Sequence, residues 1–144
     1  MARKRVVAGG TLVLDSEGLA KLAAGDARAR AFLASARAQR ARVAASAITL
    51  TETLRGGPRD AAIHQVLSRI TVVPVSVGIA RRAGELLGSA GFSGRRYAID
   101  AVVAATALRL DRPLVLLTSD PDDMNRLVEE PGVPQAKRIV VVRV

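Results

Sequence analysis

The chain has 144 residues and a formal net charge of +9, from 22 Lys and Arg against 13 Asp and Glu. It contains no cysteine and one histidine, which excludes disulfides and disfavours a zinc site built from Cys and His. The length suits one domain, 1–144 with a basic lead-in at 1–10, and the charge favours a polyanionic partner, nucleic acid first.

Composition also bears on location and on the mode of nucleic-acid binding. No apolar run approaches the roughly 18 residues of a membrane span, and Asp15 and Glu17 directly follow the first apolar stretch, where a signal peptide would be cleaved. We therefore expect a cytoplasmic protein without a membrane partner. Aromatic residues make up 2% of the chain, which is few for a platform that stacks single-stranded bases.

Strand and helix patterns alternate along the chain. Short apolar runs predict strands at 11–15, 43–48, 70–76, 113–120 and 138–144. Helices are expected at 26–42, 49–55, 58–68, 77–87, 98–110 and 122–129, with a glycine-rich loop at 88–94. Continuous apolar strands between helices indicate a sheet covered on both faces. The expected fold is α/β, a three-layer sandwich with a central, mainly parallel five-stranded sheet.

Three acidic residues follow strands, and each has an ordinary structural explanation. Asp15 ends the first strand, where turn or cap residues are common. Glu52 lies three residues after Thr49, the spacing of a helix capping box. Asp120 precedes Pro121, which fits an N-cap followed by proline at the first helical position.

Asp100 is harder to explain structurally, because it lies in the apolar run "AIDAVVAATAL" from Ala98 to Leu108. A carboxylate among Ile, Val and Ala is costly to bury without a partner. A position in the first turn of the expected helix would let the helix dipole help by about 0.3–1 kcal/mol, which does not offset desolvation. A hydrogen-bonded structural acid remains the alternative to a ligand-binding role.

The expected sheet places the four acids at one edge. In parallel sheets, ligands bind beyond the carboxyl ends of the strands, and Asp15, Glu52 and Asp120 follow such ends. Asp100 begins a helix that leads into the fourth strand, so it can lean over the same edge. Acids gathered there would repel one another, and a hard divalent cation, Mg²⁺ or Mn²⁺, would relieve the repulsion.

Four segments of the chain resemble the PIN domain family, and within it the VapC-type toxins of bacterial toxin–antitoxin pairs. They are "LVLDSEGL", "ITLTETLRG", "YAIDAVVAATAL" and "LVLLTSDPDDM", in the family's order and over nearly the whole chain. The resemblance implies a PIN-like fold and a single-strand-directed, divalent-metal-dependent endoribonuclease that leaves a 5′-phosphate and a 3′-hydroxyl. The matching metal-binding and catalytic acids are Asp15, Glu52, Asp100 and Asp120. It also implies a homodimer and a cognate antitoxin that covers the cleft.

Further residues are candidates around these acids. Asp123 lies one turn beyond Asp120 and is a candidate further metal ligand, the alternative being an acid that complements the helix dipole. Asp122 stays open in the same way. Thr118 is expected to bind an acid or the substrate phosphate. The Arg-rich helix around Phe32 and Leu33 can form part of the antitoxin groove or be an ordinary amphipathic helix.

The basic residues nearest the acids are candidates for substrate binding. Arg95 and Arg96 precede Asp100, and Arg55 follows Glu52 by nearly one helical turn. Phosphate contacts by such side chains add salt-sensitive affinity for RNA, and the alternative for each is a solvated charge.

Two other functions remain to be weighed against a nuclease. A receiver-like Mg²⁺-binding signalling domain would need an aspartate at the end of a middle strand and a lysine at the end of a late one. The expected strands at 43–48 and 70–76 end without an aspartate, and Lys137 lies before the last strand. A noncatalytic RNA-binding module is suggested by two short G-x-x-G patterns, Gly88 to Gly91 and Gly91 to Gly94. That interpretation gives the four acids no role.

Overall fold

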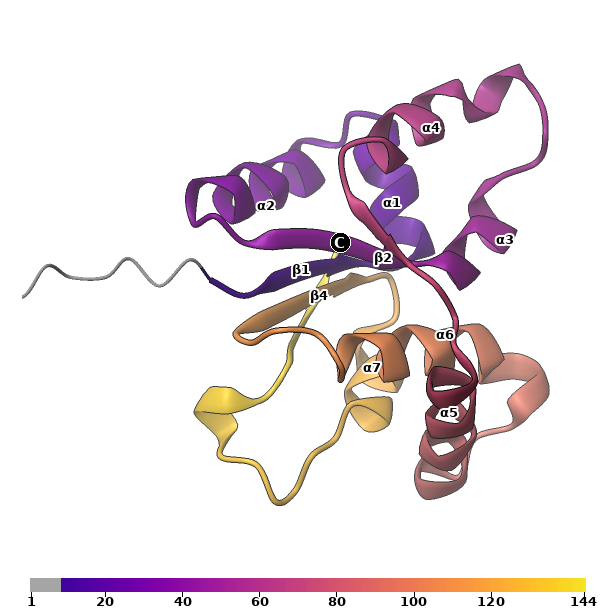
Figure 1. Ribbon diagram of the computed structural model, residues 1–144, viewed down its shortest axis with the longest axis vertical. Helices are drawn as coiled ribbons and strands as arrows, with labels where there is room; N and C mark the ends of the chain where they lie inside the picture. Colours follow the sequence, from indigo (N-terminus) through magenta and orange to yellow (C-terminus); the bar gives the residue numbers. More distant parts are fainter. Residues whose placement is uncertain (1–8) are drawn as a thin grey trace, which may run out of the picture.

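The computed structural model describes residues 9–144, whose five strands form one sheet between two helical layers (Figure 1). The strands are β1 (Thr11–Leu14), β2 (Arg42–Ser46), β3 (Thr71–Val73), β4 (Leu114–Thr118) and β5 (Val140–Arg143). Their order is β3-β2-β1-β4-β5 and every neighbouring pair is parallel. The predicted α/β three-layer fold is confirmed, with a sheet that is wholly rather than mainly parallel. Most of the predicted lead-in, residues 1–8, lies outside the described residues.

One face of the sheet carries the first group of helices, α1 (Ser16–Ala23), α2 (Ala27–Ala38) and α4 (Ala61–Leu67). Leu12 and Leu14 of β1 point into this layer and pack with Leu19 and Leu22 of α1. The other face carries α5 (Val77–Ala90), α6 (Gly94–Ala107) and α7 (Pro121–Leu127). Val13 points into that layer, so the alternation of side chains along β1 builds both cores.

The short elements lie between the main ones. Helix α3 (Leu50–Thr53) follows a 3₁₀ turn at Ala47–Thr49, and two more 3₁₀ turns lie at Pro58–Asp60 and Gln135–Lys137. The central strands are held closely at their start by Gly10, whose φ of +82° favours glycine. A Cβ atom there would lie 1.9 Å from the carbonyl oxygen of Pro113, so a side chain would push β1 and β4 apart.

The sheet has a topological switch point between β1 and β4. From β1 the chain moves through β2 to β3, and it then crosses the other face through α5 and α6 to reach β4 on the opposite side of β1. Such a reversal opens a crevice at the carboxyl ends of the two strands, where parallel α/β folds bind ligands. Asp15 directly follows β1, and Ser119 directly follows β4.

Several predicted boundaries were wrong in ways that matter for the site. Helix α1 was not predicted at all, and α2 ends at Ala38 because Arg40 takes a left-handed conformation, φ 55°. The expected loop at 88–94 is mostly helical, since α5 runs to Ala90 and α6 begins at Gly94. The first G-x-x-G pattern therefore lies largely within α5 and is not a nucleotide-clamping loop.

The capping box at Thr49 and Glu52, the structural alternative for Glu52, is absent. Thr49 forms no side-chain cap, and its hydroxyl donates to the carbonyl of Ser46 instead. The Glu52 carboxylate is therefore not engaged with the backbone N–H of Thr49 and is directed elsewhere.

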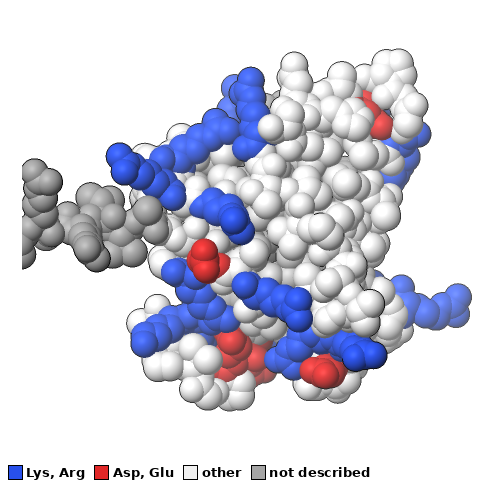
Figure 2. Space-filling view, in the orientation of Figure 1, with Lys and Arg blue, Asp and Glu red and all other residues white. Residues whose placement is uncertain are grey.

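The charge of the chain is visible on its surface. On the face shown in Figure 2, basic side chains gather along the left and lower parts, acidic ones are fewer, and the centre and right carry mostly uncharged residues. Within the described residues, no helix is both long enough and apolar enough to cross a membrane.

Candidate metal centre

A cavity of about 120 Å³ opens at the carboxyl ends of β1 and β4, at the switch point. Its wall combines residues from the start of α1, from α3, from α6 and from the residue after β4. They are Asp15, Ser16, Glu17, Glu52, Ile99, Asp100, Val103 and Ser119. Segments far apart in the sequence thus bring three of the four predicted acids to one place, and the wall is mostly polar.

Asp15 is the buried acid of the cavity, with 7% of its surface exposed. It is the N-cap of α1, and its Oδ1 accepts a hydrogen bond of 2.8 Å from the backbone N–H of Gly18. Burial raises its pKa above the ordinary value, while hydrogen bonding from Thr118, Gly18 and Ser119 opposes the rise. The structural and the functional explanations of Asp15 therefore both apply: it starts a helix and faces the cavity.

Asp100 carries the clearest electrostatic signature. Its pKa is raised to about 6, first by burial and then by the negative charges of Asp15, Glu52, Asp120 and Asp123, in that order. Because α6 begins at Gly94, Asp100 lies in the second turn and not the first, so the expected help from the helix dipole is lost. Every neighbouring charge named here disfavours its ionised form, which a bound cation would favour.

Glu52 reaches the cavity from α3 and is held there by Ser16. The Ser16 hydroxyl donates to Oε1 of Glu52 at 2.5 Å, which links α1 to α3 across the cavity. Ser16 has no counterpart among the predicted site residues. Its place directly after Asp15 is the one sequence signal that could have indicated it, because two consecutive residues at a strand end share one edge.

Asp120 and Asp123 lie beside the cavity and do not line it. Asp120 is the residue before α7, with proline at the first helical position as predicted, but its side chain makes no capping hydrogen bond. The pKa of Asp123 is raised, first by desolvation and then by the hydrogen bond and charge of Asp120. These two acids extend the negative field toward α7.

Thr118 lies beneath the acids and is 1% exposed. Its hydroxyl oxygen accepts a 3.1 Å hydrogen bond from the backbone N–H of Asp120, and it also lowers the pKa of Asp15. A buried side chain in this position can orient Asp15 but has no surface for a substrate phosphate.

The three predicted substrate-binding arginines have different surroundings. Arg95 and Arg96 are exposed in the first turn of α6, and the positive charge of Arg96 lowers the pKa of Asp123. Arg55 is occupied locally, since its Nη1 donates to the carbonyls of Leu54 at 2.7 Å and of Thr51 at 3.2 Å.

The donor set of the cavity fits a hard cation. All its charged atoms are carboxylate oxygens, the ligands that Mg²⁺ and Mn²⁺ prefer. In the arrangement seen, no three His, Asp or Glu side chains of residues 9–144 are grouped closely enough to hold one ion together. Mg²⁺ is commonly held by one or two carboxylates together with water and substrate phosphates, and Asp15 and Asp100 offer such a pair.

Comparison with solved structures gives the same architecture. A VapBC2 complex from Rickettsia felis bound to a promoter DNA fragment superposes with a TM-score of 0.65 at 17% identity, covering 94% of this chain and 99% of that one. A toxin–antitoxin complex from Klebsiella pneumoniae gives 0.61 at 25% identity, covering 91% and 95%. DNA-bound VapBC from Salmonella typhimurium gives 0.62 at 19% identity, covering 92% and 97%.

A search of curated proteins found no match. The PIN domain family matches residues 12–130, from the second residue of β1 past the end of α7. That range includes every acid described above, and the predicted family resemblance is confirmed. The chain belongs to the PIN domain family and has the fold of the VapC-like toxins in toxin–antitoxin complexes.

Proposed function

We propose that the chain is a divalent-metal-dependent endoribonuclease, the toxin of a VapBC-type toxin–antitoxin pair, acting as one domain over residues 1–144. One observation carries the proposal. Asp15, Glu52 and Asp100 converge on one cavity at the switch point, where burial and then the charges of the other two acids raise the pKa of Asp100. A cluster that resists its own ionisation is typical of a site whose positive charge comes from a ligand.

Different residues of the site have different roles in phosphodiester hydrolysis. Asp15 and Asp100 would hold Mg²⁺ or Mn²⁺, with Asp120 and Asp123 adding negative charge beside the cavity, where α7 begins. When bound, the cation supplies positive charge at the phosphate and activates water for attack. The protein itself supplies no nucleophile, and its task is to fix the geometry of the reacting groups.

Glu52 and the residues behind the acids position the reaction. Ser16 holds Glu52 at 2.5 Å, so the free carboxylate oxygen is fixed for orienting and accepting a proton from the attacking water. Gly18 and Thr118 fix Asp15 from behind. Water oxygen bonds to phosphorus, the bond from phosphorus to the 3′ oxygen breaks, and a proton passes to that leaving oxygen. The products are a 5′-phosphate and a 3′-hydroxyl.

The test is cleavage of a single-stranded RNA by the purified chain. We expect cleavage with Mg²⁺ or Mn²⁺, none with EDTA, and a loss of about a hundredfold or more in Asp100→Asn. Glu129→Gln is the matched control, because Glu129 is an exposed acid outside the cavity. Full activity in EDTA or in Asp100→Asn would contradict the proposal. RNA binding without turnover in Mg²⁺ would support the noncatalytic alternative.

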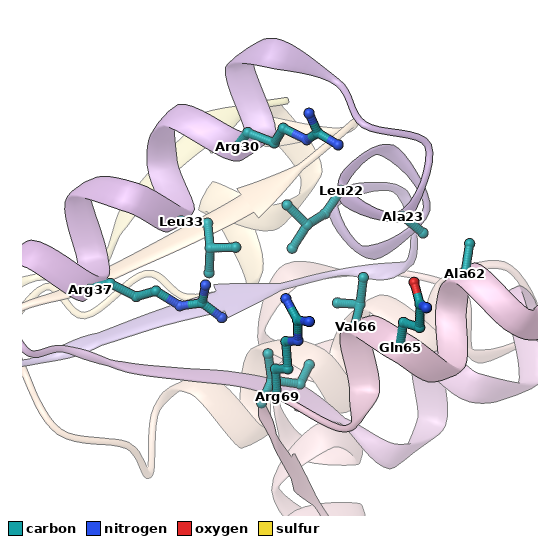
Figure 3. A pocket seen from close by; sticks show the side chains of 10 residues that line it. Leu22, Ala23, Arg30, Leu33, Arg37, Ala62, Gln65, Val66 and Arg69 are labelled. Atoms are coloured by element: carbon teal, nitrogen blue, oxygen red, sulfur yellow. The ribbon is translucent and has the colours of Figure 1, made fainter.

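The proposed antitoxin partner fits a second cavity, between α1, α2 and α4 (Figure 3). Its floor is apolar, formed by Leu22 of α1, Leu33 of α2 and Val66 of α4. Figure 3 shows Arg37 and Arg69 projecting toward this floor from two sides. An apolar floor between guanidiniums suits an amphipathic segment that carries carboxylates. The similar structures from Klebsiella pneumoniae and Salmonella typhimurium are a toxin–antitoxin complex and a DNA-bound VapBC complex.

This partner is tested by growth and rescue. Expression of the chain should halt growth, and the cognate antitoxin should restore it. A variant with Arg37→Glu and Arg69→Glu should remain toxic and resist the antitoxin, because the like charges repel its carboxylates. Equal rescue of both proteins would contradict the groove assignment.

A homodimer is the other proposed assembly. Two large apolar residues, Val75 and Val77, are 38% and 70% exposed at the connection from the edge strand β3 to α5. Adjacent exposed apolar side chains favour association of two copies. Val77→Glu should shift the wild-type dimer toward monomer in sedimentation equilibrium, and an unchanged mass would place the interface elsewhere.

A further inference from the structure

Two of the three aromatic rings of the chain lie on each other near the acid cavity. The ring centroids of Phe92 and Tyr97 are 4.2 Å apart and the ring planes meet at 21°. Phe92 belongs to the short connection between α5 and α6, and Tyr97 lies in the first turns of α6. Gly91 takes the left-handed conformation that ends α5, and Phe92 then donates its backbone N–H to the carbonyl of Leu87.

Each ring also carries a guanidinium. The Cζ atom of Arg126, from α7, lies 4.3 Å from the centroid of Phe92, and that of Arg96 lies 5.2 Å from the centroid of Tyr97. Rings stacked at 4.2 Å leave no room between them, so both guanidiniums lie outside the ring pair. We call these four residues the arginine–aromatic stack.

The stack has an evident structural role at one end. Nη2 of Arg126 donates a 2.6 Å hydrogen bond to the carbonyl of Ala90, the last residue of α5, which ties α7 to the end of that helix. This bond uses one of the five N–H donors of Arg126. It does not explain why a second guanidinium is placed on the neighbouring ring.

Both guanidiniums act on an acid that lies beside the cavity. Arg96 lies four residues before Asp100 on α6, and Arg126 lies three residues after Asp123 on α7, so each shares a helix face with an acid. The positive charges of Arg96 and Arg126 both act on Asp123. Two helices thus bring two positive groups close to Asp123, beside the cavity.

Neither guanidinium is neutralised by a contact within the described residues. The two ion pairs found in residues 9–144 join Arg82 to Glu85 and Arg112 to Glu130. Arg96 and Arg126 therefore interact electrostatically with Asp123, but neither forms an ion pair with a carboxylate. Stacking on rings reduces the freedom of both side chains, which lowers the entropy cost of binding an anion.

We propose that Phe92 and Tyr97 are positioning residues that hold Arg96 and Arg126 for a backbone phosphate of single-stranded RNA, next to the phosphate that is cleaved. The inference rests on the proposed ribonuclease function and adds to it the direction of the strand, from the acid cavity over the start of α6 and the end of α7. The rings themselves do not stack on bases, because their faces are already covered by each other and by the arginines.

The test is the salt dependence of RNA binding in EDTA, where proposed cleavage is prevented. The probe is a short fluorescein-labelled single-stranded RNA, followed by anisotropy across a salt series. Arg96→Gln and Arg126→Gln should each lower the slope of log K against log salt by about 0.7, the contribution of one phosphate contact on a single strand. Arg42→Gln is the matched control. Arg42 is exposed at the start of β2, and the acid cavity lies at the other end of the strands.

Ring variants separate positioning from charge. Tyr97→Leu keeps the net charge, and we expect it to weaken RNA binding by roughly fivefold, while Tyr97→Phe restores wild-type affinity. In Mg²⁺ the Tyr97→Leu protein should show a raised KM with a retained kcat, because the acids are untouched. A purely structural role for the ring would lower Tm and leave the RNA affinity of the folded protein unchanged.

The outcomes distinguish this inference from the function on which it rests. The proposed role of the arginine–aromatic stack would be wrong if both arginine variants kept the wild-type slope of log K against log salt. It would also be wrong if Tyr97→Leu kept the wild-type RNA affinity and KM. If Tyr97→Leu fails to fold, the salt dependence of RNA binding by Arg96→Gln and Arg126→Gln still tests the proposal. An absence of metal-dependent cleavage by the wild-type chain, with the slopes changed as expected, would instead overturn the ribonuclease and leave a binding surface.

Discussion

Two aspartates of this chain, Asp60 and Asp100, have opposite surroundings. Asp60 ends the 3₁₀ turn before α4 and is buried, and its Oδ2 accepts hydrogen bonds from the backbone N–H groups of Gly56 at 2.7 Å and Arg55 at 2.9 Å. Those bonds lower its pKa. Asp100 faces other acids, and burial with their charges raises its pKa to about 6.

The contrast separates an acid that serves the fold from one that serves a ligand. The charge of Asp60 is satisfied by the chain itself, since two N–H groups of the α3–α4 connection depend on it. The charge of Asp100 is opposed by its burial and by the acids around it. Removing each charge should therefore have opposite consequences for stability and for activity.

The largest expected effect is on RNA cleavage and concerns Asp15, which both stabilises the fold and faces the cavity. Asparagine is as good an N-cap as aspartate, so Asp15→Asn should keep α1 and the fold. Cleavage of RNA should fall about a hundredfold or more, because a ligand charge is lost. Asp15→Ala should lose stability as well. A fully active Asp15→Asn would remove this acid from the site.

The next effect is on stability, at Asp60. Asp60→Ala leaves two backbone N–H groups without an acceptor, so thermal unfolding should begin several degrees lower, with Asp60→Asn intermediate. RNA cleavage per folded molecule should equal that of wild type. Loss of cleavage with an unchanged Tm would show that the comparison assigns Asp60 to the wrong class.

The pH dependence of stability gives a second test of the contrast between Asp60 and Asp100. The folded-state pKa of Asp60 lies below its ordinary value of 3.8, so its charge stabilises the fold above that pH and the contribution is lost as pH falls through the lowered pKa. The difference in Tm between wild type and Asp60→Asn should therefore shrink as pH falls below about 4. A constant difference would contradict the assignment of the stabilisation to the charge.

Asp100 should show the reverse. Its folded-state pKa of about 6 exceeds 3.8, so the metal-free protein should lose stability as pH rises from about 4 to beyond 6. At neutral pH, Asp100→Asn should be more stable than wild type by about 1 kcal/mol, a value reduced for solvent screening of a partly exposed group. Unfolding in EDTA measures this, and a less stable Asp100→Asn would contradict the account.

The smallest effect is expected at Ser16. Ser16→Ala removes the donor that holds Glu52, so kcat should fall several-fold while metal affinity changes little. Ser16→Thr keeps the hydroxyl and should restore most of kcat. An equal loss in both variants would point to packing and not to the hydrogen bond.

The sequence supported the fold well because the strands are continuous apolar runs. Val13 and Leu116 belong to two such runs, and both are fully buried on the same face. The predicted helix boundaries were less accurate near two glycines, which were expected to lie in a loop. Gly88 lies inside α5, and the position of Gly94 as the first residue of α6 places Asp100 one turn deeper than expected.

The site was predictable only where it depends on strand ends. Asp15 follows β1, and its place at the edge follows from the parallel sheet. Ser16 was missed because its role depends on the direction in which the Glu52 side chain leaves α3, which the sequence pattern does not determine. The arginine–aromatic stack was missed because Phe92 and Arg126 meet only through the packing of α5 against α7.

The most direct test is Mn²⁺ binding, measured by the loss of the free-ion signal in electron paramagnetic resonance. We expect saturable binding by the wild-type chain, loss of that binding in Asp100→Asn, and unchanged binding in Glu129→Gln. Equal Mn²⁺ binding by wild type and Asp100→Asn, or none by the wild type, would show that the acids converging on the cavity do not form a cation site.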